Sequence, residues 1–130
     1  MSGPYPNDQS VSGGAVPSWV APGVAGAGYI PKAANASSIT TGGTAVNVVT
    51  GLINGGYILN PLTAAAQKIV TAENLYIDFI NTPGSTDANG NGTTLDLQPG
   101  QGYALPAIAS GVTLKANAAT SGHSFTIFVW

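Results

Sequence analysis

The feature that most constrains this fold is the alternation of side chains in short runs between residue 44 and the end of the chain. In the run 75–80, Leu75, Ile77 and Phe79 fall on one side of an extended backbone. A period of two is typical of a β-strand with one face against a core. Turn sequences such as Gln98-Pro99-Gly100 separate the runs. The pattern predicts an all-β fold, either an antiparallel β-sandwich or a jelly-roll-like barrel.

We expect about seven short strands in this part of the chain. They are predicted over residues 44–50, 55–60, 75–80, 93–97, 102–105, 112–117 and 124–130. In the fourth strand, Leu95 and Leu97 are expected to point inward. The segment 61–74 is either a short helical turn that begins near its proline or a loop leading into the next strand. The last run, SFTIFVW, is apolar on both faces and therefore needs two covers. The second cover could be another sheet, the N-terminal residues or a partner subunit.

Residues 1–43 have a different character. They hold five of the nine prolines and show no sustained period of two or 3.6. They also carry Tyr5, Trp19 and Tyr29, which a purely flexible linker does not need. We interpret residues 1–43 as an extended, Gly/Pro-rich arm that lies on its own domain or on a neighbouring subunit, with a flexible tail as the alternative. Residues 44–130 would then be the β-sandwich domain, expected to fold without the arm.

The scarcity of charge excludes several classes of partner. Only 6% of the residues are charged, against about a quarter in a typical protein, while 44% are hydrophobic. There are three lysines and no arginine, too few cations for nucleic-acid binding. No apolar stretch reaches the roughly 20 residues that span a bilayer. The start, MSGPYPNDQS, lacks the features of a signal peptide, so we expect synthesis in the cytoplasm. Such a neutral chain suits a place inside an assembly.

Catalytic constellations are not evident in the sequence. His123 is the sole histidine and cysteine is absent. Serines at 121 and 124 flank it, but close neighbours along a strand give no evidence for a triad. We expect His123 to be a surface or hydrogen-bonded residue. The carboxylate spacings, Glu73 with Asp78 and Asp87 with Asp96, do not suggest an acid–base pair. We therefore predict no enzyme, no catalytic residue, no metal site and no cofactor.

One loop resembles a metal-binding motif. In TDANGNGTT, residues 86–94, Asp87 begins the D-x-N-x-N-G opening of an EF-hand calcium loop. The twelfth position, which needs a bidentate carboxylate, is Gln98. The flanking sequences predict a turn and a strand instead of helices. A hairpin tip is therefore the favoured interpretation, and Asp87 remains the place where a weak calcium site could lie.

The aromatic residues are the candidates for contact with another molecule. They could form a sugar-binding platform, but we favour anchors for a core or a protein interface. The interface candidates are Tyr5, Trp19, Tyr29, Phe128 and Trp130.

Four phrases of the chain resemble a known group of proteins. They are INGGYILNP (53–61), TAENLYIDF (71–79), the glycine-rich run 90–101 and GVTLKANAATSGHSFTIFVW (111–130). Together they resemble small virion proteins that tailed bacteriophages encode beside their structural genes. The resemblance runs from about Thr41 to the end and leaves most of the arm outside.

This resemblance implies a capsid cement or decoration protein. Such a protein would be a dimer or trimer on the virion surface, with the major capsid protein as its partner. No catalytic residues are implied. A receptor- or glycan-binding module of a head fibre or tail is the alternative function.

Overall fold

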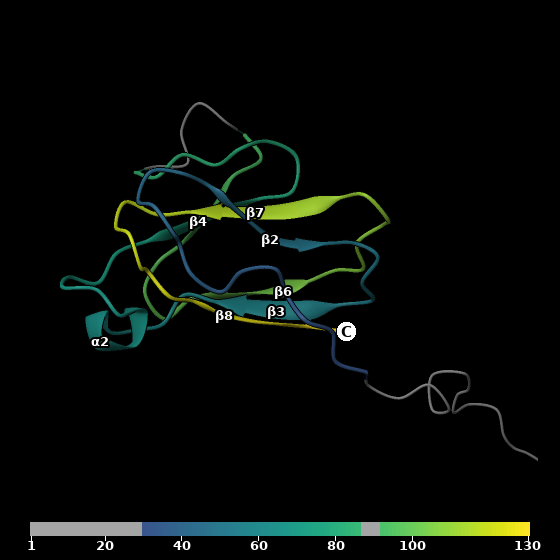
Figure 1. Ribbon diagram of the computed structural model, residues 1–130, viewed down its shortest axis with the longest axis horizontal. Helices are drawn as coiled ribbons and strands as arrows, with labels where there is room; N and C mark the ends of the chain where they lie inside the picture. The colour runs from purple at the N-terminus through teal and green to yellow at the C-terminus, as the bar shows by residue number, and fades with distance from the viewer. Residues whose placement is uncertain (1–29, 87–91) are drawn as a thin grey trace, which may run out of the picture. The chain divides into compact units, whose positions relative to one another are not determined.

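The computed structural model describes residues 30–86 and 92–130, which form two antiparallel β-sheets and one helical turn (Figure 1). The all-β class predicted from the sequence is confirmed. The first sheet has the strand order β2 (Val46–Thr50), β7 (Thr113–Asn117), β4 (Leu75–Asp78), β5 (Leu95–Leu97). The second has the order β6 (Gly102–Leu105), β3 (Gly56–Leu59), β8 (Thr126–Val129).

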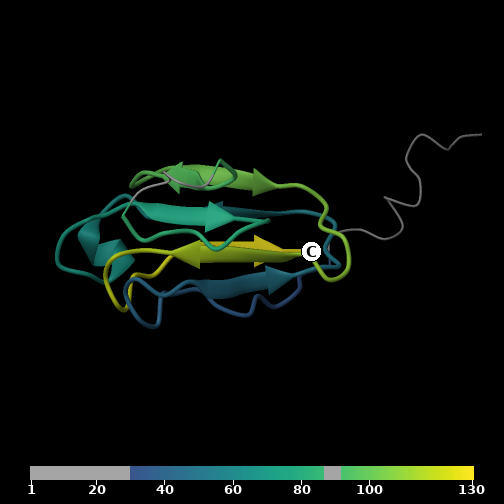
Figure 2. The same cartoon turned by 90° about the horizontal axis from the view of Figure 1, so that it is seen from above.

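The two sheets form two layers with one shared hydrophobic core (Figures 1 and 2). Ile58 of β3 and Val129 of β8 are fully buried, as are Ile77 of β4 and Leu114 of β7. Their alternation with more exposed or polar neighbours explains why these segments form strands with one face inward. The arrangement is sandwich-like, and each of the seven expected strands has a counterpart among the described residues.

The outer face of the four-stranded sheet is covered by the protein's own chain. Tyr76 and Asp78 of β4 point away from the core, yet their side chains are only 5% and 1% exposed. The hydroxyl group of Tyr76 donates a hydrogen bond to the carbonyl oxygen of Thr86 at 2.8 Å. Asn117 of β7 donates to the carbonyl oxygen of Pro83 at 3.0 Å. The segment that follows β4 thus lies over this face, and β4 is buried on both sides (Figure 1).

Asp78 holds this covering segment in place. Its carboxylate accepts hydrogen bonds from two backbone amides and two hydroxyl groups, at distances of 2.7 to 3.0 Å. The donors are the amides of Ile80 and Asn81 and the hydroxyls of Thr93 and Thr94. Burial alone would raise the pKa of Asp78, but these bonds outweigh it and hold the pKa below its ordinary value.

A bridging segment, residues 31–43, closes the side of the domain where β2 and β8 are edge strands. The amide of Lys32 donates to Val129 of β8 at 2.8 Å, and the amide of Asn35 donates to Val48 of β2 at 2.7 Å. Val48 is free to accept because it is the bulged residue of β2, with no register partner on β7. Ile39 is fully buried in the core. The bridging segment therefore belongs to the compact unit Pro31–Trp130, although the sequence groups it with the arm.

Two local expectations have clear outcomes. The segment 61–74 contains a helical turn, α2 (Ala64–Gln67), capped by the Thr63 hydroxyl and ended by Lys68 in the left-handed conformation. Leu95 is the register partner of the inward-facing Ile77, so it lies on the inner face as predicted, but it remains 38% exposed. Strand β5 is an edge strand of three residues paired only with β4, so the far end of its inner face is not covered.

Candidate functional site

The outer face of the three-stranded sheet carries an aromatic row, formed by Tyr57, Phe128 and Trp130. Tyr57 and Phe128 are register partners on β3 and β8, and Trp130 follows two residues later on the same side. The ring centroids of Tyr57 and Phe128 are 6.0 Å apart with an interplanar angle of 29°. Those of Phe128 and Trp130 are 6.2 Å apart at 23°. These spacings place the three rings in a continuous contact series.

Two glycines, Gly102 and Gly55, allow the rings at the two ends of the row to pack against the backbone of the sheet. A Cβ atom at Gly102 would fall 2.0 Å from the Tyr57 hydroxyl and 2.3 Å from the adjacent ring carbon. A Cβ atom at Gly55 would fall 2.9 Å from the Trp130 ring. The rings therefore occupy the space above the backbone that any larger residue would fill. One face of each of these rings is packed on the sheet, and the other is directed outward.

The aromatic row is partly open to solvent. Phe128 is 45% exposed, and Tyr57 and Trp130 are half-buried. No Asp, Glu, Lys or Arg occurs in β3, β6 or β8. Exposed aromatic side chains on strands that lack charged residues are the composition found at the centre of protein interfaces. This surface is the strongest candidate for binding another molecule in the described part of the chain.

The structure separates the residues that the sequence grouped as interface candidates. Phe128 and Trp130 lie in the aromatic row, whereas Tyr5, Trp19 and Tyr29 fall outside the described residues. Tyr57 completes the row because β3 pairs with β8, a pairing that local sequence does not reveal. Other aromatic side chains lie outside the aromatic row. Tyr76 is buried under its covering segment, and Tyr103 packs against Phe79 beside the core.

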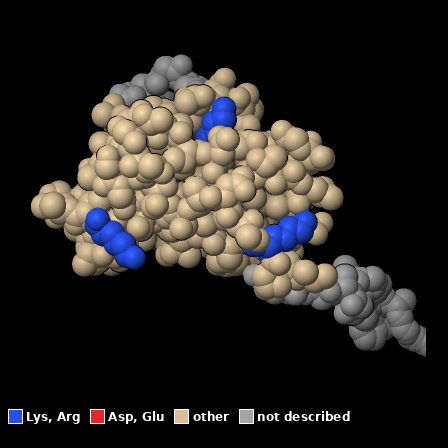
Figure 3. All heavy atoms as spheres, in the orientation of Figure 1, with Lys and Arg blue, Asp and Glu red and all other residues tan. Residues whose placement is uncertain are grey.

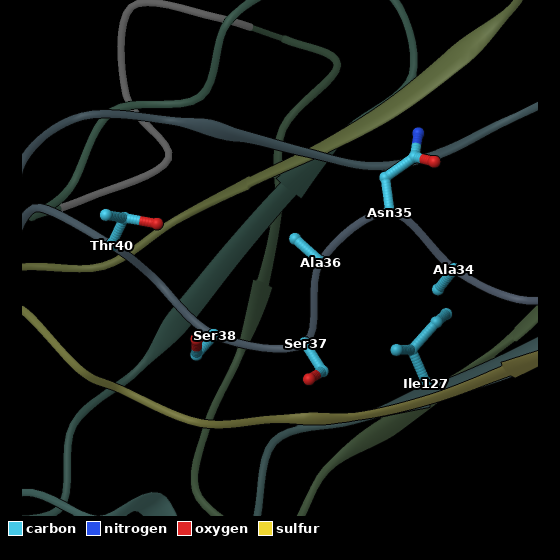
Figure 4. Close-up of a pocket in the computed structure, with 7 residues that line it drawn as sticks. All are labelled: Ala34, Asn35, Ala36, Ser37, Ser38, Thr40 and Ile127. Atoms are coloured by element: carbon cyan, nitrogen blue, oxygen red, sulfur yellow. The ribbon is translucent and has the colours of Figure 1, made fainter.

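A hollow of about 520 Å³ lies where the bridging segment arches away from β8. Figure 4 shows it between the segment and the strand, with small side chains around it. It is lined by Ala34, Asn35, Ala36, Ser37, Ser38, Thr40 and Ile127. The segment pairs at Lys32 with Val129 of β8 and at Ser38 with Ser124, which precedes β8, and leaves the edge of Ile127 unpaired by any described backbone group. The hollow holds no charged side chain, so it offers at most a small polar recess.

His123 is hydrogen-bonded, one of the two situations expected for it, and it is fully buried. Its Nδ1 atom lies 2.9 Å from Oε2 of Glu73, and its Nε2 atom lies 2.9 Å from Oδ1 of Asn60. Glu73 and Asp78, which the sequence places five residues apart, are held in separate hydrogen-bond networks. They do not form an acid–base pair.

The described residues contain no group of three or more His, Cys, Asp or Glu side chains arranged to hold a metal ion. The calcium hypothesis at Asp87 falls on residues 87–91, outside the described part of the chain. Among the described residues, no helix is long and apolar enough to cross a bilayer. On the face of the molecule that Figure 3 shows, the lysine side chains lie apart and form no cluster.

Comparison with known proteins adds no relative. No protein-family model, curated protein or solved structure matches the chain. The function is therefore argued from the aromatic row and from the sequence resemblance.

Proposed function

We propose that this protein is a structural virion protein, a capsid cement or decoration protein. It binds the outer surface of a phage capsid and stabilises contacts between major capsid subunits. The observation that carries the proposal is the aromatic row on an uncharged sheet face, half-exposed in a small domain. The sequence resemblance to small phage virion proteins points to the same class.

The chemistry of the row suits permanent contact with protein. Aromatic side chains each bury a large area and are frequent energetic centres of interfaces. Because β3, β6 and β8 lack charged residues, docking this face does not require the desolvation of an ion on this side. Tyr57 and Trp130 are already packed on glycines, so little side-chain freedom is lost on binding.

Symmetry amplifies such a contact. A cement protein that forms a dimer or trimer presents several copies of the row to neighbouring capsid subunits at once. Linked contacts of modest strength then give an avidity well above that of one contact. In this proposal the partners are the major capsid protein and other copies of this chain. The protein is made in the host cytoplasm, acts on the capsid surface and catalyses no reaction.

Glycan binding is the second candidate, favoured by one observation. The rings of Tyr57 and Trp130 lie over glycines with one face outward, a geometry on which a sugar ring could stack. A receptor- or glycan-binding head-fibre or tail module would use the row in this way. Binding on an array of bacterial surface polysaccharides would support this candidate, and loss of that binding in Phe128→Ser would assign it to the row.

Cryo-microscopy of purified virions that carry the protein tests the cement proposal. We expect density for the two-sheet domain on the outer shell, at junctions between capsid subunits, with the β3–β6–β8 face toward the shell. Absence from the virion, or density only in the tail, would remove the proposal.

A further inference from the structure

The His123 cluster is a buried polar group at the end of the domain near α2. It consists of Asn60, Gln67, Glu73, Thr120 and His123. Asn60, Gln67 and His123 are fully buried. Asn60 directly follows β3, Gln67 lies in α2, and Glu73 precedes β4. Thr120 and His123 belong to the turn before β8. The cluster thus joins segments that are far apart in the sequence, at the end where Figure 2 shows α2 beside that turn.

The orientation of the Asn60 amide is fixed by backbone acceptors. Its Nδ2 atom lies 2.9 Å from the carbonyl oxygen of Glu73 and 2.8 Å from that of Leu97. A carbonyl oxygen can only accept, so the nitrogen end must face these two groups. The Oδ1 end then faces the cluster, where Nε2 of Gln67 donates to it at 3.1 Å. Asn60 therefore offers His123 an acceptor and no donor.

Gln67 has a fixed orientation for the same reason. Its Nε2 atom lies 2.7 Å from the carbonyl oxygen of Pro61, and its Oε1 atom accepts from the backbone amide of Glu73 at 2.9 Å. Reversing this side chain would place two donors against each other at Glu73. The donor role of Gln67 toward Asn60 is therefore secure, and Nε2 of His123 must carry a proton.

The other ring nitrogen faces a carboxylate. Nδ1 of His123 lies 2.9 Å from Oε2 of Glu73, which also accepts from the amide of Thr120 at 3.0 Å. Oε1 of Glu73 accepts from the Thr120 hydroxyl at 2.7 Å. Burial alone would raise the pKa of Glu73, but the hydrogen bonds from Thr120 and His123 outweigh it and lower the pKa. Glu73 is thus ionised, and Nδ1 of His123 must donate as well.

We propose that His123 is a buried imidazolium ion that forms, with Glu73, a proton-dependent lock between α2 and the turn before β8. Both ring nitrogens donate, one to Oδ1 of Asn60 and one to Oε2 of Glu73. Glu73 is the titratable group that faces the ring. The other facing groups, Asn60 with Gln67 behind it and Thr120, are neutral, and Lys68 at the end of α2 is exposed. The protonated ring pairs its charge with the carboxylate of Glu73. A neutral ring would have one unprotonated nitrogen, and this acceptor would face another acceptor, the oxygen of Glu73 or of Asn60.

The lock is coupled to the backbone on both sides of His123. The amide of Ser124 donates to the carbonyl oxygen of Gln67 at 2.7 Å, which joins the segment just before β8 to α2. The carbonyl oxygen of His123 accepts from the amide of Ile39 at 2.8 Å, which joins the turn to the bridging segment. Loss of the Glu73 charge at acid pH should therefore loosen these joins first.

Nitrogen-15 NMR of the full-length chain tests the protonation state directly. The chain has one histidine, so its ring signals need no assignment among several. At pH 7 we expect both ring nitrogens of the native protein to show protonated chemical shifts. In Glu73→Gln the charge that faces Nδ1 is lost. The ring should then become neutral with its proton on Nε2, because the side-chain amide can donate to Nδ1, and the Thr120 amide loses its acceptor. A neutral ring in the native protein at pH 7 would overturn the proposal.

Hydrogen exchange tests the lock itself. In Glu73→Gln at pH 7 the protection of the Ser124 amide should fall by at least roughly tenfold, the effect of one buried hydrogen-bonding group left without its partner. The Leu114 amide, in the other sheet, serves as the reference for global unfolding and should change less. Equal changes at both amides would show a uniform loss of stability and would contradict a local lock. Asp96→Asn, which alters an exposed carboxylate, is the matched control and should leave both unchanged.

Discussion

The outer faces of the two sheets differ in what covers them. On the four-stranded sheet, Tyr76, Asp78 and Asn117 are buried beneath the protein's own chain. On the three-stranded sheet, Phe128 is 45% exposed and no described segment lies over the aromatic row. The first face includes the carboxylate of Asp78, which the chain itself satisfies, whereas the strands of the second face contain no charged residue. The first face is thus used by the fold itself, whereas the second is the face that the proposed function assigns to a partner.

The largest expected effect comes from deleting the bridging segment, residues 31–43. Deleting residues 1–30 should leave the unit Pro31–Trp130 folded. Deleting residues 1–43 also removes the fully buried Ile39 and the carbonyl group of Gly43 that accepts from Asn117. We therefore expect that residues 44–130 do not fold alone, which differs from the expectation from the sequence. The second deletion should cost more than about 5 kcal/mol and unfold the domain.

Circular dichroism and chemical unfolding of both truncated proteins would check this result. A cooperative transition in the shorter protein, with a midpoint close to that of the longer one, would show that the bridging segment is dispensable.

Asp78→Ala should give the next largest effect. The substitution leaves two amides and two hydroxyl groups without their charged acceptor beneath the covering segment, at a cost of about 3 kcal/mol. Asp96→Ala changes an exposed carboxylate on the neighbouring strand and should stay within about 0.5 kcal/mol. Urea unfolding of the two variants measures the difference. Similar values would mean that the covered face owes little to Asp78.

Acid should weaken the covered face. The pKa of Asp78 is lowered in the folded state, so its charge stabilises the fold at pH values above the unfolded pKa of about 4. That stabilisation is lost as the pH falls through the lowered folded pKa. The unfolding free energy of the native protein should therefore decrease from pH 5 to pH 3, with a shallower slope in Asp78→Asn. Parallel slopes would show that another group causes the acid response.

Gly102→Ala tests the aromatic row with a smaller effect. The new methyl group would overlap the Tyr57 ring, which must move or force the strands apart, at a cost of about 1 to 2 kcal/mol. A methyl group at Gly92 would have no described atom within 4 Å, and φ at Gly92 is not positive. Gly92→Ala is therefore the control and should be near neutral. Thermal unfolding compares the two variants. A neutral Gly102→Ala would mean that the Tyr57 ring is not seated on the glycine.

Much of the fold could be predicted because β-strands leave a local signature. The alternation around Leu75, Ile77 and Leu114 identified strands whose inner faces are indeed buried. The exposure of Leu95 could not be predicted the same way, because it depends on the sheet edge at which β5 lies. Similarly, the burial of Tyr76 depends on a segment that folds back over the sheet.

Only part of the candidate site could be predicted from the sequence. The two apolar faces of the last strand indicated that Phe128 and Trp130 need a second cover, and the structure shows these side chains partly exposed. Tyr57 and the glycines beneath the rings join them only through the pairing of β3 with β6 and β8. The partners of His123 come from residues 60 and 73, so its burial had no local signal.

The binding of Phe128→Ser to capsids that lack the protein tests the central claim most directly. Val70 is 96% exposed and lies in the chain between α2 and β4, so Val70→Ser is the matched control for removing an exposed apolar side chain. The unfolding free energy of both variants should stay within about 1 kcal/mol of that of the native protein. In co-sedimentation, Phe128→Ser should bind at least roughly tenfold more weakly, while Val70→Ser binds like the native protein. Equal binding by both folded variants would contradict the assignment of the aromatic row as the contact face.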